Sequence, residues 1–182
     1  MIVRYNGHLR LLGVIQNSRS VKNVVASKQI FLAHKAASQL TDVRRYSDTS
    51  AAIANLEVHS RYGYDGAGRI SRITLAKTEI AAGQIWNGNS TLPASLTAST
   101  FIAGYALGYD RDNRIASSAN FVVSLNTTYT HRSDDQLTGA SSAAIPELAA
   151  PVYTPPAEAY TLDNADNRLL AGNGATFDQR HA

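Results

Sequence analysis

Aromatic and aliphatic residues alternate with small polar residues in several short stretches of the chain. Tyr62 and Tyr64 stand two residues apart, and Tyr105, Leu107 and Tyr109 keep the same spacing. A period of two places side chains on one face of a β-strand, and Tyr is a strong strand former. The stretches end in clusters of Asp, Gly, Asn or Ser, which are typical of turns. The alternation therefore predicts strands joined by tight turns.

The turn clusters belong to an internal repeat. Gly63–Ile70 (GYDGAGRI) recurs as Gly108–Ile115 (GYDRDNRI). Both copies keep Gly-Tyr-Asp, two free positions, Gly or Asn, and Arg-Ile. The repeat residues are Tyr62, Tyr64, Asp65, Gly68, Arg69 and Ile70 in the first copy, and Tyr109, Asp110, Asn113, Arg114 and Ile115 in the second. Repeat arrays build surfaces and walls more often than single catalytic pockets.

Weaker copies extend the repeat. A third copy contains Tyr129, Asp135, Gln136 and Leu137; a fourth, one residue longer, contains Tyr160, Asp163, Asn167, Arg168 and Leu169; the most eroded copy is His34–Leu40. The closing aliphatic residues of the five copies lie 30, 45, 22 and 32 residues apart. The smallest spacing indicates the basic unit, so the spacing of 45 is either two units or one unit with an insertion.

Each copy predicts a β-hairpin. Asp65 can accept a hydrogen bond from the backbone two residues on, and Gly68 falls where a three-residue hairpin loop needs a left-handed residue. Asn113 is the best substitute for glycine there; Asp135 is tolerated, and Ser38 fits worst. The Arg or Gln that follows can reach back across the pair. Because one hairpin is marginal in water, several should lie side by side. The expected fold is mainly all-β, an array of antiparallel β-hairpins forming a curved repeat sheet.

The rest of the chain is less regular. Residues 1–33 form a basic segment, expected to hold strands of a degenerate repeat; residues 34–169 form the array, with a Pro/Ala-rich loop at about 140–160; and 170–182 is a truncated tail. Segment 20–39 fits a strand or a short helix. Residues 1–80 hold twelve Lys/Arg and five Asp/Glu. The basic residues are dispersed, which favours a solvated face over a polyanion site, so no nucleic-acid partner is expected.

The motifs resemble a known family. Tyr62–Ile70 resembles the tyrosine-aspartate (YD) repeat of the Rhs family, written Y-x-Y-D-x-x-G-R-L. Tyr160–Leu169 is similar to the longer variant that ends in G-N-R-L, and Gln136-Leu137-Thr138-Gly139 keeps the end of the D-Q-L-T-G form. His34, His131 and Leu162 depart from the pattern, because they replace motif tyrosines. The copies together span about residues 34–169.

The resemblance implies a fold and a role. In the Rhs family the hairpins form a hollow β-shell; in bacterial toxins this shell encloses a C-terminal toxin, and in teneurins a similar shell is a cell-surface adhesion module. YD repeats are also linked to carbohydrate binding. The implied partners are therefore the remainder of a longer Rhs chain, its toxin cargo, and glycans, and the implied location is secreted or at the cell surface. The motif that closes the shell and a toxin domain are missing, and five units are too few to close a shell, so we expect a fragment of a longer chain.

No residue pattern predicts catalysis. The chain has no cysteine, and no apolar stretch suggests a signal peptide or a membrane span. Gly66 and Gly68 lack the third glycine of a dinucleotide-binding loop, and Asp110–Asn113 lacks the glycine and glutamate of a calcium loop. The five histidines show no metal-ligand spacing, and G-x-S-x-G is absent. We expect no catalytic, cofactor-binding or metal site, and therefore no enzyme.

Trp86 and the tyrosines leave two functions open. Aromatic rows on a sheet pack strand against strand, or they stack on sugars. The first hypothesis is a structural segment of a β-shell, and the second is a repeat module that binds glycans or a cell-surface partner. The exposure of Tyr62, Tyr64, Tyr105 and Tyr109 separates them, because buried rings cannot meet a sugar.

Overall fold

The computed structural model describes residues 1–18, 26–146, 148, 151, 153–162 and 168–170. Their regular structure consists of β-strands and one short 3-10 helix, η1 (Ile53–Asn55). The strands are β1 (Ile2–Tyr5), β2 (Leu11–Gln16), β3 (Lys28–His34), β4 (Leu40–Tyr46), β5 (Leu56–Tyr64), β6 (Ile70–Ala76), β7 (Phe101–Tyr109), β8 (Ile115–Asn120), β9 (Leu125–His131), β10 (Leu137–Ala144), β11 (Glu158–Ala159), β12 (Thr161–Leu162) and β13 (Arg168–Leu170).

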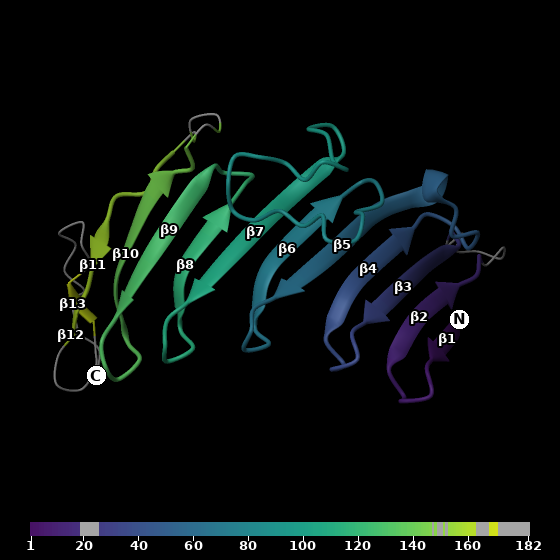
Figure 1. Cartoon of the computed structure of the whole chain (residues 1–182), viewed down its shortest axis with the longest axis horizontal. Helices are drawn as coiled ribbons and strands as arrows, with labels where there is room; N and C mark the ends of the chain where they lie inside the picture. The colour runs from purple at the N-terminus through teal and green to yellow at the C-terminus, as the bar shows by residue number, and fades with distance from the viewer. Residues whose placement is uncertain (19–25, 147, 149–150, 152, 163–167, 171–182) are drawn as a thin grey trace. The chain divides into compact units, whose positions relative to one another are not determined.

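The strands follow one another in the sheet in the order of the sequence. Strands β1 to β11 form one sheet in which each strand is hydrogen-bonded to the next, while β12 pairs with β13 alone (Figure 1). The neighbouring strands run antiparallel, as β1 does with β2 and β5 with β6. The prediction of an all-β array of antiparallel hairpins is therefore confirmed.

The chain divides into two compact units, and the division falls within β7. The first unit comprises residues 1–87 and 91–105, and the second comprises residues 88–90 and 106–182. The first unit contains the hairpins β1–β2, β3–β4 and β5–β6, whose tips lie side by side at one end of the strands (Figure 1). The second unit contains the tips that join β7 to β8 and β9 to β10.

The spacing of 45 residues is explained by an insertion. Strands β6 and β7 are neighbours in the sheet, and residues 77–100 between them contain no strand. Within the first unit this insertion packs on the sheet and forms a core. Ile80 and Trp86 are fully buried, and Ile80 and Leu96 cluster with Ala76. The backbone amide of Trp86 also donates to Thr74 Oγ1 at 2.8 Å. Trp86 is therefore a packing residue.

Two segments differ from the sequence-based expectations. The loop predicted at about 140–160 is shorter, because β10 continues to Ala144 and pairs with β9 as far as Leu125. Across this pair, Ser142 Oγ lies 2.8 Å from Thr127 Oγ1. Residues 28–34 are strand β3, so the described part of segment 20–39 contains no helix. The fourth tip, with Asp163 and Asn167, and the tail at 171–182 lie outside the described residues; Arg168 and Leu169 lie on β13.

Candidate functional site

The tip of the hairpin β5–β6 is a closed network of short-range hydrogen bonds. The amide of Gly68 donates to the carbonyl of Asp65, and the amide of Asp65 donates to the carbonyl of Arg69. Asp65 Oδ1 accepts from the amides of Ala67 and Arg69, and Arg69 Nε donates to Asp65 Oδ2 at 2.7 Å. Gly68 has a φ of +83°. The Asx-turn, the left-handed fourth residue and the arginine that reaches back all occur as the sequence predicts.

The same four-residue tip occurs five times among the described residues. In each tip the fourth amide donates to the first carbonyl, and the first amide donates to the carbonyl of the residue after the tip, here called the fifth position. The fourth residue is always left-handed: Leu9 (φ 57°), Ser38 (φ 63°), Gly68 (φ 83°), Asn113 (φ 67°) and Asp135 (φ 71°). The tips are therefore 6–9, 35–38, 65–68, 110–113 and 132–135.

The tip Asn6–Leu9 was missed by sequence reasoning. Asn6 Oδ1 accepts from the amides of His8 and Arg10, as Asp65 Oδ1 does in its own tip. A signal was present, because Tyr5-Asn6 and Arg10-Leu11 match Tyr-Asp and Arg-Ile of the strong copies. Leu9 hid it, since a leucine with positive φ is uncommon. The described part of segment 1–33 thus contains a tip with the same backbone geometry as the other four.

The fifth-position side chains connect successive hairpins. Arg10 Nη1 donates to the carbonyl of Lys35 at 2.8 Å, and Gln39 Nε2 donates to the carbonyl of Gly68 at 2.9 Å. In the second unit Arg114 Nη1 donates to the carbonyl of Arg132 at 2.7 Å. Each bond joins the fifth position of one hairpin to the tip of the next. The arginine or glutamine side chain therefore connects neighbouring tips, and Arg114 also binds Asp110 of its own turn.

Tyrosines of the motif also take part in these junctions. Tyr64 donates its hydroxyl hydrogen to the carbonyl of Leu40 at 2.7 Å, and Lys35 Nζ lies 5.1 Å from the centre of its ring. In the second unit, Tyr129 Oη on β9 lies 3.1 Å from Ser118 Oγ on β8. Tyr62, Tyr64 and Tyr109 are half-buried, and Tyr105 is 36% exposed. The exposure of these tyrosines therefore does not separate the packing hypothesis from the sugar-binding hypothesis. The hydroxyl of Tyr64, however, is used in a hydrogen bond between two hairpins.

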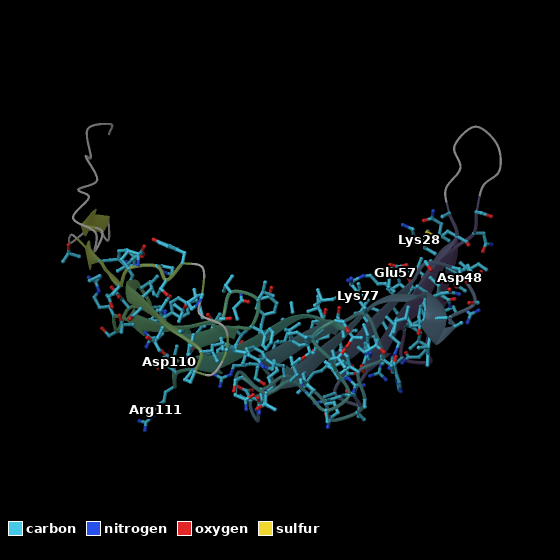
Figure 2. All side chains as sticks on the ribbon, turned by 90° about the horizontal axis from the view of Figure 1, so that it is seen from above. Lys28, Asp48, Glu57, Lys77, Asp110 and Arg111 are labelled. Carbon is cyan, nitrogen blue, oxygen red and sulfur yellow. The ribbon has the colours of Figure 1, made fainter. Side chains whose placement is uncertain are left out.

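The carboxylates of Asp65 and Asp110 are held ionised by the arginine of their own tip. The pKa of Asp65 is lowered by hydrogen bonds from the side chain and backbone of Arg69. For Asp110, burial would raise the pKa, but hydrogen bonds from Arg114 outweigh it and the pKa is lowered. Arg111 at the same tip extends away from the ribbon (Figure 2). Carboxylates that are permanently ionised and bound by arginine are poor proton donors and acceptors near neutral pH.

A buried polar cluster that the sequence did not reveal lies on strands β4 and β5. His59 is fully buried, and its Nε2 lies 2.8 Å from Asp42 Oδ1. Its Nδ1 accepts the backbone amide of Ile80, at the start of the insertion, at 2.8 Å. Since Nδ1 is an acceptor, Nε2 carries the hydrogen that is donated to Asp42. Arg61 Nε donates to the same Asp42 oxygen at 2.7 Å.

The charges of this cluster stabilise one another. Burial would raise the pKa of Asp42, but hydrogen bonds from His59 and Arg61 outweigh it, so the pKa lies well below its usual range. Arg44 makes a two-pronged ion pair with Glu79, with Nε and Nη2 within 3.0 Å of its carboxylate oxygens. This bond lowers the pKa of Glu79 and raises that of Arg44.

The histidine–aspartate pair has little scope for catalysis. In a nucleophilic triad, the histidine nitrogen that does not face the carboxylate accepts a proton from the nucleophile. Here that nitrogen is Nδ1, which is occupied by the amide of Ile80, and the ring is fully buried. The cluster fastens the insertion to the sheet: Ile80 binds His59, and Glu79 binds Arg44.

Two cavities adjoin the sheet of the first unit. The larger, of about 610 Å³, is lined by β2 to β5, with Val14, Ile30 and Arg45 on its wall. Figure 2 shows two further lining residues, Lys28 and Glu57, in the same part of this unit. The smaller, of about 290 Å³, lies beside Arg61, whose Nη1 is buried without a hydrogen-bond partner among the described residues.

The described residues contain no group of three or more His, Asp or Glu side chains placed to hold a metal ion. None of the helical structure in the described segments has the length and hydropathy needed to cross a bilayer.

Comparison with known proteins adds no family. The sequence matches no protein-family model and no curated protein. The resemblance to YD repeats thus stays a prediction from the motifs quoted above.

Proposed function

We propose that this chain is a structural segment of an Rhs/YD-repeat β-shell, a wall that in the family encloses or presents a toxin, with no catalysis of its own. One observation carries the proposal: the fifth-position side chains of Arg10, Gln39 and Arg114 each bind the tip of the next hairpin. Such bonds support the continuity of the sheet from one hairpin to the next.

The chemistry of the motif residues supports a wall rather than an active centre. Asp65 and Asp110 spend both carboxylate oxygens on their own turns. The buried His59 spends both ring nitrogens on the protein. A general acid or base needs a proton position open to substrate, and none of these groups offers one. The side chains of Asp65, Asp110 and His59 thus hold turns and strands together.

A chimera tests the wall function. Residues 1–146 would replace an equal stretch of hairpins in the shell of a bacterial Rhs toxin, and protection of the enclosed toxin against added protease would be measured. We expect protection equal to that of the parent shell. A matched chimera carries Arg10→Ala, Gln39→Ala and Arg114→Ala, and we expect it to leak. Digestion of the toxin in both chimeras, with the chimeric shell still folded by circular dichroism, would refute the proposal.

The surrounding gene offers a second test. A reading frame that continues into further YD motifs and a toxin domain would support a shell segment. Stop codons on both sides, with a short product detected by mass spectrometry, would oppose it.

Binding to glycans or to a cell surface is the alternative. Exposed aromatic rings favour it, since Tyr105 is 36% exposed and Tyr5 is 59% exposed. The fully buried Trp86 and the hydrogen-bonded Tyr64 count against it. A glycan array probed with the wild-type chain and with Tyr105→Ala distinguishes the two. Hits that disappear with Tyr105→Ala would favour the binding module, and an array without hits would favour the wall.

A further inference from the structure

We propose that Asn6 is a modification site: its side-chain amide is hydrolysed to a carboxylate, and the resulting aspartate completes the tip Asn6–Leu9. The reaction uses the backbone of Gly7 and needs only water as co-reactant. Two separate observations support it, an arginine nitrogen without an acceptor and an exposed glycine directly after the asparagine. The modification goes beyond the wall function, because it concerns the chemistry of one turn and not what the sheet encloses.

The tips 65–68 and 110–113 use both side-chain oxygens of their aspartate. Asp65 Oδ1 accepts from backbone amides of its own turn, while Oδ2 accepts from Arg69 Nε at 2.7 Å. Asp110 divides its oxygens in the same way, and Arg114 Nε donates to its Oδ2 at 2.6 Å. In both tips the arginine at the fifth position is therefore bound to the first residue of its own turn.

The tip Asn6–Leu9 lacks this arginine bond. Asn6 Oδ1 accepts from the amides of His8 and Arg10, as Oδ1 of the two aspartates does in their tips. The other polar atom of the Asn6 side chain is Nδ2, which is a donor and cannot accept. Arg10 Nε is buried and has no hydrogen-bond partner among the described residues. A buried donor without an acceptor is destabilising, and an oxygen in place of Nδ2 would supply the acceptor.

The surroundings of Asn6 favour the hydrolysis. Gly7 is exposed, and a Cβ at this position would meet nothing within 4 Å, so its nitrogen is not shielded by neighbouring atoms. The amide of Gly7 donates no hydrogen bond to a described residue. The side-chain carbonyl that this nitrogen would attack already accepts two backbone N–H groups, at 2.9 and 3.0 Å. Such donors stabilise the negative charge that develops on the oxygen during the attack.

The reaction is balanced with water alone. The Gly7 nitrogen forms a bond to Asn6 Cγ and gives up its proton, and the bond from Cγ to Nδ2 breaks, so that ammonia leaves with that proton. Water then adds to Cγ of the cyclic imide, and the new bond to the Gly7 nitrogen breaks. This step restores the peptide and leaves a carboxylate and a proton, without oxidation or reduction. Addition of water to the backbone carbonyl carbon would instead give isoaspartate, which lengthens the backbone of the turn.

The product repeats an arrangement that the chain already contains. One carboxylate oxygen at position 6 keeps the two backbone amides, and the other accepts from Arg10 Nε. Arg10 Nη1 stays on the carbonyl of Lys35 in the next tip. Arg114 shows that one arginine can do both, because its Nε binds Asp110 of its own tip while its Nη1 binds the carbonyl of Arg132. The aspartate is ionised near neutral pH, so its bond to the guanidinium is charge-assisted.

Ageing of the full chain near neutral pH tests the reaction. Samples taken over weeks are digested, and mass spectrometry with electron-transfer fragmentation distinguishes Asn, Asp and isoaspartate at position 6. Asn87-Gly88 is the internal control, because Asn87 is exposed and its side chain accepts no hydrogen bond from a described residue. We expect Asp at position 6 to form faster than any product at Asn87. Gly7→Ala should slow its formation several-fold and leave urea unfolding unchanged, since the added methyl group has room.

Asn6→Asp tests the product directly. Its equilibrium constant for unfolding in urea should be about two- to tenfold smaller than that of the wild type, the worth of one charge-assisted hydrogen bond near the surface. The gain should disappear when Arg10→Ala removes the donor. Four outcomes would overturn the inference: intact Asn6 in chains that have lost the Asn87 amide, isoaspartate as the main product at position 6, no gain in stability from Asn6→Asp, or a gain that persists with Arg10→Ala.

Discussion

The side-chain amide of Gln39 donates to the backbone carbonyl of Gly68 at 2.9 Å, across 29 positions of sequence. Gln39 follows the tip of one hairpin, and Gly68 is the left-handed residue in the tip of the next. The bond therefore couples two turns that each close locally. It connects the two hairpins through a side chain, in addition to the backbone pairing of β4 with β5.

Removing this bond should weaken the first unit. We expect Gln39→Ala to lower the free energy of unfolding by about 1 kcal/mol, the net worth of a typical hydrogen bond. Urea unfolding measures the loss, and amide exchange should show faster opening near Gly68. Gln16→Ala is the control, because Gln16 is exposed and its side chain makes no hydrogen bond to a described residue. Equal losses in the two variants would contradict the coupling.

Leu9 is a site where the repeat can be improved. It adopts a φ of 57° and is 85% exposed, so it has strained backbone and little burial to lose. The left-handed conformation costs a non-glycine residue roughly 1–2 kcal/mol. We therefore expect Leu9→Gly to raise the melting temperature, with a gain of about 1 kcal/mol. The reverse change, Gly68→Leu at φ 83°, should lower stability by a similar amount. An unchanged melting temperature for Leu9→Gly would mean that the tip relaxes around the leucine.

Sequence reasoning found what is encoded locally. The tip Asp65–Gly68 is closed by bonds that span at most four residues, so its residue types reveal its geometry. The same holds for Asp110–Asn113. The tip Asn6–Leu9 has the same bonds from its backbone amides but a leucine at its strained position, and turn propensity alone does not find it.

The buried cluster could not be predicted in this way. Asp42 and His59 are 17 residues apart, and they meet only because β4 and β5 pair in one register. The second partner of His59 is the backbone amide of Ile80, which carries no side-chain signature in the sequence. His59 is thus a buried core residue partly because of the insertion, and the insertion has no motif that would show this in the sequence.

Gly104 provides a test of how closely the insertion packs. A Cβ at this position would lie 2.5 Å from Cε3 of Trp86 and 2.8 Å from Cζ of Phe101. Overpacking of this kind typically costs about 1–3 kcal/mol, so Gly104→Ala should be destabilising by that amount. The fluorescence of Trp86, the single tryptophan, reports the change directly. Gly66→Ala is the matched control, since nothing lies within 4 Å of a Cβ there.

His59 should be the most sensitive residue of the cluster. His59→Ala leaves the amide of Ile80 and the carboxylate of Asp42 without a buried partner and opens a cavity. We expect a loss of about 3 kcal/mol in unfolding free energy. His8→Ala, at an exposed position, should change it by less than about 0.5 kcal/mol. If His59→Ala and His8→Ala are equally stable, the hydrogen bonds of the cluster do not hold the insertion.

Acid should weaken the first unit through Asp42. Its pKa in the folded protein lies below that of an unfolded aspartate, because the hydrogen bonds of His59 and Arg61 outweigh burial. The unfolded chain therefore binds the proton first, and the stability that Asp42 contributes is present above about pH 4 and lost as the pH falls further. Urea unfolding from pH 7 to pH 2 should show this decline. The Asp42→Asn protein should be less stable than the wild type near neutral pH. Its unfolding free energy should fall less on acidification, because only other carboxylates such as Glu79 still contribute to the decline. Parallel pH profiles for the two proteins would show that Asp42 makes no such contribution.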